Sequence, residues 1–201
     1  DPEKLDNAVE QVKALEGFYS IGVVYKGRLV IEEYSFGDKD TQLPVWSATK
    51  SIISALFGQM IDQGLLKDEF IPINEFFPQL TDETKKLITI SQLLTMTSGI
   101  KDDLSYMYSP TPSSYILDFE LDFSPGTWWA YTSAGTHILS IILNKTTNET
   151  ANDYAMEHLF SKIGITNYKW EADQQGNHNG GYGLYLNLQD MLRFGHLFLQ
   201  E

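Results

Sequence analysis

Apolar residues stand three or four positions apart along the first segment, from Leu5 to Leu15, until Gly17 interrupts the spacing. This period matches one face of an α-helix, so the pattern predicts an amphipathic helix at the start of the chain. Asp1 is suited to the N-cap position of this helix, and Pro2 to its first helical position.

The next segment carries the clearest β-pattern. Two runs, 18–25 and 28–36, are rich in β-branched and aromatic residues. Lys26-Gly27 between them suits the tight turn of a β-hairpin. Because a two-stranded hairpin is rarely stable by itself, we expect further strands to complete its sheet.

Helical patterns dominate from residue 48 onward. The segment 51–66 is apolar on nearly all sides, which is typical of a helix buried in the middle of a domain. Short helices are predicted over 90–99, where Gly99 ends the pattern, and near 113–119, inside an irregular stretch rich in Tyr, Ser and Pro. Longer helices are predicted over 134–145, 149–162 and 188–200. The residues best suited to cap these helices are Ser91, Ser133, Asn148 and Asn187.

A helix, a hairpin and then a block of helices indicate an α+β fold. A chain of 201 residues can bury one substantial core, so we expect 1–201 to form a single domain. In that domain, 1–45 supplies a helix and the first sheet strands, and 46–201 is mainly helical.

The composition predicts an acidic surface. Lys and Arg total 14 against 27 Asp and Glu, a formal net charge of −13, and the acidic residues are dispersed along the chain. Such a surface repels phosphate backbones and anionic lipid, which argues against nucleic acid as a partner. No apolar run approaches the roughly 20 residues needed to span a bilayer, and the charged N-terminal segment is unlike a signal peptide.

Residue types that bind metals are sparse. The chain has no Cys, which excludes disulfides, thiolate metal sites and a cysteine nucleophile. The histidines are far apart and outside any HExxH-like pattern, so we expect no metal site and interpret each as a surface or partly buried imidazole. They are His137, His158, His178 and His196.

Ser47 and Lys50, in the stretch VWSATKSIISALFG, form an S-x-x-K pattern where the buried helix begins. Residues three apart on a helix share a face, so the two side chains can touch. Burial and the positive end of the helix dipole favour a neutral lysine, which can take the proton of the serine hydroxyl. The same helix end offers the Ser47 N–H to an oxyanion. Spacing alone also allows Ser47 to be only a helix cap.

The same four-letter pattern occurs at Ser98 to Lys101, in a different context. Gly99 follows Ser98 at a predicted helix end, so these two side chains need not share a face. We therefore prefer the first match.

A second candidate lies in FSPGTWWAYTSAGTHILSIIL, where Tyr131 follows the turn at Pro125-Gly126. A tyrosine beside a lysine can relay a proton between nucleophile and leaving group. Taken singly, Tyr131 is better explained as an ordinary partly buried aromatic residue, since the chain has eleven tyrosines. Trp129, Trp128 and Tyr108 can wall an acyl pocket or serve plain packing.

In combination these stretches resemble a known family. The order SATK, SQLLTMTSGI, PGT followed by YTS, and GGYGLYLNLQDMLRFG is similar to that of the penicillin-recognising serine hydrolases, specifically their class C β-lactamase-like branch. That branch includes β-lactamases, D-Ala-D-Ala carboxypeptidases, esterases and amide hydrolases that act on nylon oligomers. The resemblance implies a β-lactamase/transpeptidase-like fold, an antiparallel sheet flanked by helices plus a mainly helical part. It also favours an exported or periplasmic protein.

Carried over to this chain, the resemblance makes Ser47 the acylated nucleophile, Lys50 its base partner and Tyr131 the proton relay. It implies a covalent acyl-enzyme on a small-molecule substrate, without a cofactor. Ser133 stands where members that act on β-lactams or peptides usually have asparagine, and a hydroxyl cannot present both donor and acceptor as an amide does. We therefore expect an esterase or small-amide hydrolase rather than a true β-lactamase, with Ser133, Trp129 and Tyr108 at the substrate.

The family's third motif, Lys or His, a small residue and Gly on a sheet strand, has no counterpart after the 188–200 helix. The letters of His178-Asn179-Gly180 fit, but they precede that helix in a Gln/Asn/Gly-rich loop, and Asn187 of Tyr-Leu-Asn is better explained as a cap. We expect the 201 residues to be the N-terminal part of a longer protein that holds the C-terminal strands, or these strands to be supplied separately. The alternative function is a catalytically silent, penicillin-binding-like sensor or regulatory module.

Overall fold

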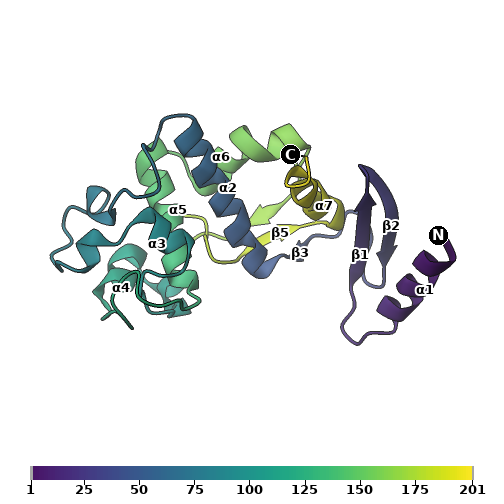
Figure 1. The fold of residues 1–201 in the computed structure, drawn as a ribbon, viewed down its shortest axis with the longest axis horizontal. Coiled ribbons are helices and arrows are strands. Elements are labelled where there is room, and N and C mark those ends of the chain that lie inside the picture. The colour runs from purple at the N-terminus through teal and green to yellow at the C-terminus, as the bar shows by residue number, and fades with distance from the viewer. Residues whose placement is uncertain (1, 201) are drawn as a thin grey trace.

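The structure, a computed structural model, describes residues 2–200 and is an α+β fold (Figure 1). A hairpin region, residues 2–36, lies at one end of the molecule, and a helical body, residues 43–187, forms the rest. The last helix, α7 (Leu188–Leu197), lies between the two. The expected N-cap Asp1 falls outside the described residues.

The hairpin region holds helix α1 (Pro2–Lys13) and the antiparallel strands β1 (Ser20–Tyr25) and β2 (Arg28–Tyr34). The turn residues Lys26 and Gly27 have φ of 50° and 74°. Positive φ at both positions matches a type I′ turn, whose twist fits that of the strands. The predicted hairpin is confirmed, with Tyr25 opposite Arg28 in its register.

Helix α7 packs against β1 of the hairpin. A Cβ atom on Gly22 would lie 2.5 Å from Leu192 Cδ1, so the absence of a side chain at Gly22 lets Leu192 approach the strand. This contact joins the hairpin region to the rest of the molecule.

A second, three-stranded sheet lies in the helical body, apart from the hairpin. It contains β3 (Leu43–Pro44), β4 (Lys169–Trp170) and β5 (Leu184–Leu186) in the antiparallel order β3-β5-β4. The sequence pattern did not predict β4 and β5, because strands of two or three residues are too short to show alternation. Within residues 2–200 the hairpin pairs with no further strand, so its sheet is not completed there.

Two buried helices form the centre of the body. Helix α2 (Thr49–Asp62) packs against α5 (Ser133–Thr147), in which every residue from Ser133 to Leu143 is buried. The predicted helix over 51–66 thus begins two residues earlier and ends at Asp62. Around this pair lie α3 (Ile90–Leu94), α4 (Pro112–Asp118) and α6 (Ala151–Ala155). The predicted helix over 149–162 is not continuous, because α6 passes into a π-helical turn and then a 3₁₀ turn.

Three of the four predicted caps are wrong, each by one or two positions. Thr89 caps α3 with a capping box, Thr132 caps α5, and Thr150 caps α6. Asn148, at φ 59°, instead ends α5 in the left-handed conformation that asparagine tolerates. The predicted cap Asn187 is confirmed, since its side chain accepts the N–H of Asp190. At all three sites the cap is a threonine, and the sequence offered a serine or asparagine one or two positions away as an alternative.

Candidate active site

Ser47 lies between β3 and α2, in a short 3₁₀ turn (Trp46–Ala48). It does not cap α2 with its side chain, because the N-cap position is Ala48 and no side-chain cap bond is formed. Trp46, just before it, has φ 47°, a left-handed conformation that is strained for a bulky residue. Ser47 is exposed to solvent at the beginning of the buried helix.

Lys50 lies in the first turn of α2, and its side-chain nitrogen is within hydrogen-bond distance of three oxygens. Its Nζ is 3.2 Å from Ser47 Oγ, 3.1 Å from Ser133 Oγ and 2.6 Å from the carbonyl oxygen of Gly181. Ser47 and Lys50 therefore touch as their spacing predicts. The contacts with Ser133 and Gly181 join segments 83 and 131 residues away along the chain.

Tyr131 completes the cluster from the extended segment before α5. Its hydroxyl donates a hydrogen bond to Ser47 Oγ, and Lys50 Nζ lies over its ring, 4.7 Å from the centroid. The sequence predicted Ser47, Lys50 and Tyr131 as one site, and the structure brings all three together.

Asp102 fixes the beginning of α5. Its Oδ1 accepts the N–H of Ser133 at 2.7 Å and that of Ala134 at 3.1 Å, where a helix has unpaired donors and a positive dipole end. This anchors Ser133, which is buried beside Lys50. Sequence reasoning missed Asp102, because nothing in its local sequence points to partners about thirty positions away.

Gly180 and Gly181 are packed against the first turns of α5. A Cβ on Gly180 would lie 2.3 Å from Thr136 O, and one on Gly181 would lie 2.7 Å from Ser133 Cβ. Only glycine fits so close to a helix, and this approach brings the Gly181 carbonyl to Lys50. Sequence reasoning missed Gly181 too, although a Gly-Gly pair can mark a close backbone approach.

The aromatic residues predicted to wall the site lie on the surface. The ring of Trp129 is 6.5 Å from that of Tyr131, at 60°, so it stands next to the cluster with 58% of its surface exposed. Tyr108 is 81% exposed, and Gln174 Nε2 bonds its backbone oxygen rather than its side chain. The structure therefore brings Trp129 to the site and shows no contact between Tyr108 and the cluster.

The family described as Beta-lactamase has a model that matches residues 5–201. The chain belongs to this β-lactamase family. It is 25% identical over 177 residues to the protein named "Putative penicillin-binding protein PbpX" of Bacillus subtilis (strain 168), an alignment covering 82% of this chain and 43% of that protein. It is 24% identical over 183 residues to "Protein flp" of Staphylococcus aureus (strain MW2), covering 78% and 37%. The chain spans less than half the length of either relative.

Solved structures bear out the β-lactamase/transpeptidase-like fold. The D-alanine carboxypeptidase AmpC of Burkholderia cenocepacia superposes with a TM-score of 0.79 at 19% sequence identity, covering 100% of this chain and 66% of that one. Among residues 2–200, no helix of this β-lactamase-family chain is long and apolar enough to cross a membrane.

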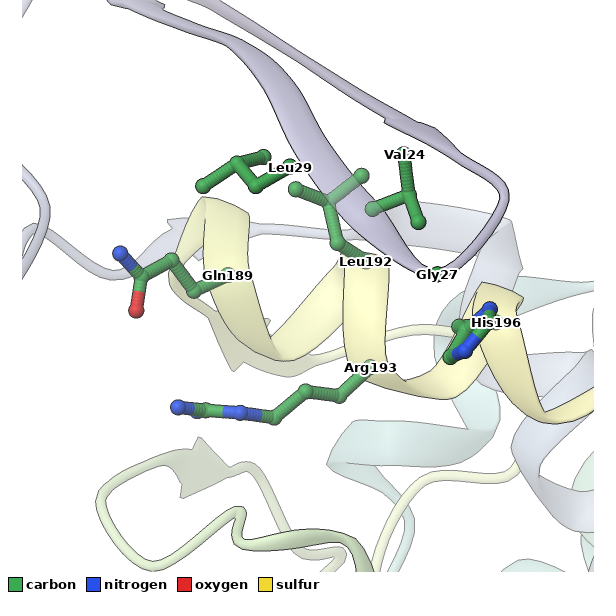
Figure 2. Close-up of a pocket in the computed structure, with 7 residues that line it drawn as sticks. All are labelled: Val24, Gly27, Leu29, Gln189, Leu192, Arg193 and His196. Atoms are coloured by element: carbon green, nitrogen blue, oxygen red, sulfur yellow. The ribbon is translucent and has the colours of Figure 1, made fainter.

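Two surface hollows of this family member help to place the cluster of Ser47, Lys50 and Tyr131. One of about 340 Å³ is lined by Tyr19, Leu43, Pro44 and Trp46, the last of which directly precedes Ser47. Another of about 250 Å³ lies between the hairpin and α7, where Val24 and Leu29 face Leu192 (Figure 2). This second hollow contains none of Ser47, Lys50 and Tyr131.

One group in the described part of the chain has the residue types of a metal site. Ligand atoms of Glu149, Glu157 and His158 lie within 4.8 Å of one another. His158 also contacts Gln63, just past the C-terminal end of α2, whereas Ser47 precedes its N-terminal end. The sequence analysis did not foresee this grouping, because it joins residues from both sides of a helix start.

Proposed function

We propose that the protein is a serine hydrolase that forms an acyl-enzyme on an ester, amide or β-lactam-like carbonyl substrate. The observation that carries the proposal is the meeting of Ser47 Oγ with both Lys50 Nζ and Tyr131 OH. A hydroxyl attacks a carbonyl only when a base takes its proton, and two groups able to handle that proton are in contact with it.

The surroundings of Lys50 suit the role of base. A neutral amine has two N–H bonds and one lone pair. If Gly181 O and Ser133 Oγ accept the two N–H bonds, the lone pair is directed at the Ser47 hydroxyl. Lys50 then takes the proton as the bond between Oγ and the carbonyl carbon forms. Tyr131 delivers a proton to the leaving group as the carbonyl–leaving-group bond breaks and regains one from Lys50, so the proton taken from Ser47 ends on the leaving group. Water later hydrolyses the acyl-enzyme.

Oxyanion stabilisation is supported in part by the described residues. The Ser47 N–H lies at the start of α2, where backbone donors and the helix dipole favour negative charge. In the family, the second donor comes from the third-motif strand. His178-Asn179-Gly180 does not replace it here, because Asn179 is fully buried and Gly180 packs against α5.

The identity of residue 133 favours an ester or small amide over a true β-lactam substrate. Ser133 is 6% exposed and its hydroxyl is engaged with Lys50, so it offers little to a substrate amide. Similar structures include proteins named as a D-alanine carboxypeptidase and a 6-aminohexanoate-dimer hydrolase, both of which have amide-bond substrates in their names. Trp129 is the best-placed residue for a substrate wall, and Tyr108 is a further candidate.

The test is labelling of the full-length protein with a fluorophosphonate, which reacts with activated serines. We expect labelling of the wild type and none of Ser47→Ala. Ser54→Ala, an exposed serine on the same helix, is the matched control and should label normally. Labelling that survives Ser47→Ala would refute the assignment.

A silent sensor or regulatory module is the second candidate, favoured by the absence of a third-motif strand among residues 2–200. Turnover separates the two functions. If the wild type hydrolyses p-nitrophenyl esters and Ser47→Ala does not, the protein is an enzyme. Labelling of Ser47 without turnover of esters or amides would favour the sensor.

A further inference from the structure

A buried histidine–aspartate pair lies behind the candidate site, between α5 and the loop before β5. The side chains of His137 and Asp173 are both fully buried, with Nε2 2.9 Å from Oδ2. This corrects the expectation that His137 is a surface or partly buried residue. Gly180 N is 3.4 Å from His137 Nδ1, and a backbone N–H can only donate. Nδ1 therefore accepts, and the proton on Nε2 is donated to Asp173.

Asp173 is held as a carboxylate by several donors. Its oxygens accept hydrogen bonds from the N–H groups of Gln175 and Asn177 and from the Asn177 side chain. Burial raises the pKa of Asp173, but the hydrogen bonds from His137 and Asn177 outweigh it and leave that pKa below its ordinary value. A fully bonded buried carboxylate is a rigid anchor for the imidazole.

Asn179 holds the neighbouring peptide from the other side. Its Oδ1 accepts the N–H of Gly181 at 2.8 Å, the N–H of Tyr182 at 3.3 Å and the hydroxyl of Tyr106 at 3.0 Å. Its Nδ2, by contrast, is buried and has no partner among the described residues. A buried amide donor without a partner lowers the stability of the fold. The hydrogen bonds of the Asn179 side chain are therefore those that its Oδ1 accepts.

Tyr106 links the His137–Asp173 pair to Asn179. Its ring stacks on His137, with centroids 4.6 Å apart at 19°, while its hydroxyl bonds Asn179. The consecutive N–H groups of Gly180 and Gly181 are thus both fixed by one buried unit.

The carbonyl of Gly181 faces Lys50, at 2.6 Å from Nζ. We propose that His137, Asp173 and Asn179 are positioning residues, which orient the amine of Lys50 through the Gly180-Gly181 backbone. The inference rests on the proposed function. When Gly181 O is held, one N–H of the amine is fixed and its lone pair stays on Ser47; when the peptide shifts, the amine turns away.

The test uses saturation kinetics of fluorophosphonate labelling in the full-length protein, which separate the maximal rate of Ser47 phosphonylation, the probe's counterpart of acylation, from the dissociation constant of the probe. His137→Gln can keep a donor towards Asp173 but loses the Nδ1 acceptor, whereas His137→Asn keeps an acceptor near Gly180. We expect His137→Gln to lower the maximal rate by about 10- to 100-fold at an unchanged dissociation constant, as a misplacement near 1 Å does. His137→Asn, which keeps the acceptor near Gly180 but loses the donor to Asp173, should slow the reaction less, by about 3- to 10-fold.

The control is Ile142→Ala, fully buried further along the same helix, which should lower stability without slowing acylation. Equal acylation rates for the wild type and His137→Gln would overturn the positioning role, as would an equal loss in Ile142→Ala.

If the His137 variants do not fold, Tyr106→Phe removes only the hydroxyl bond to Asn179. It should slow acylation by about 3- to 10-fold, and an unchanged rate would count against the proposal. Labelling that does not depend on Ser47 would refute the proposed function itself, whatever His137 does. Labelling that depends on Ser47 but not on His137 or Tyr106 refutes the positioning role alone.

Discussion

In the helical body, polar side chains are partly or fully buried and bond to several segments of the chain. In the hairpin region, large apolar side chains are exposed. Lys50 bonds oxygens from three segments of the body, and the His137–Asp173 pair is fully enclosed behind it. In contrast, no residue of α1 is buried, and large side chains of the hairpin such as Tyr25 and Leu29 face solvent. Polar side chains of the body are therefore fixed by several partners, whereas apolar side chains of the hairpin keep much of their surface uncovered.

The largest difference between the two regions should appear when a lysine is removed from each. Lys50→Ala deletes the proposed base, so the acylation rate should fall by about 10²- to 10⁴-fold. Lys26→Asn places asparagine in the hairpin turn, where Asn-Gly suits positive φ, and should leave acylation unchanged. Fluorophosphonate labelling rates measure both, and a wild-type rate in Lys50→Ala would remove lysine from the mechanism.

Alanine substitutions at two glycines compare a position where the backbone is closely packed with one where it faces open space. Gly181→Ala forces a Cβ to within 2.7 Å of Ser133, so we expect acylation to slow by about 10²-fold and unfolding to become easier by about 2 kcal/mol. Gly58→Ala, on the open face of α2 with no atom within 4 Å, should instead stabilise by about 0.5–1 kcal/mol. Urea unfolding and labelling of both proteins are the measurements. A wild-type labelling rate in Gly181→Ala would show that the loop holding Gly181 can move to accommodate the Cβ without displacing Lys50.

Leucine truncations compare the packing of the two regions. Leu56→Ala empties a fully buried position on α2 and should cost about 2–5 kcal/mol. Leu29→Ala, on a hairpin residue that is 45% exposed, should cost about 1 kcal/mol or less. Urea denaturation gives both free energies of unfolding. Similar losses would mean that the hairpin is packed as firmly as the body.

The smallest effect is the pH dependence of stability. The folded pKa of Asp173 is lower than its unfolded value, so its ionised form stabilises the fold above about pH 4, and that contribution is lost as pH falls through the lowered pKa. The stability difference between wild type and Asp173→Asn should therefore shrink as pH is lowered below about 4. Asp38, whose pKa is lowered by a hydrogen bond from Thr41, is fully exposed in the loop after β2. Asp38→Asn should show a smaller change over the same pH range.

Most of the fold could be predicted where the chain carries long periodic patterns. The hairpin and α2 and α5 were predicted from such patterns, because many residues contribute to each. Strands β4 and β5 and the caps of α3 and α6 were not, because each depends on one to three residues. The choice between Thr89 and Ser91, for example, is decided by the single residue Gln92, which stands three positions after Thr89 and completes a capping box with it.

The candidate site shows the same division. Ser47 and Lys50 touch at the beginning of α2, so local spacing identified them as candidates, and the family resemblance favoured a site over a helix cap. Tyr131 was found from its turn and the family resemblance. Asp102 and Gly181 were missed, because they act through a carboxylate at a distant helix end and a backbone carbonyl, and neither leaves a pattern in side-chain types.

The separation between Lys50 and Gly181 also has a consequence for synthesis. The contact between Ser47 and Lys50 can form as soon as α2 does, but Gly181 is made 131 residues after Lys50. A nascent chain therefore carries the serine–lysine pair long before the carbonyl that orients the amine has left the ribosome. Closing so long a loop comes late in folding. In the proposed mechanism, Lys50 is therefore correctly oriented beside Ser47 only once most of this chain has been made.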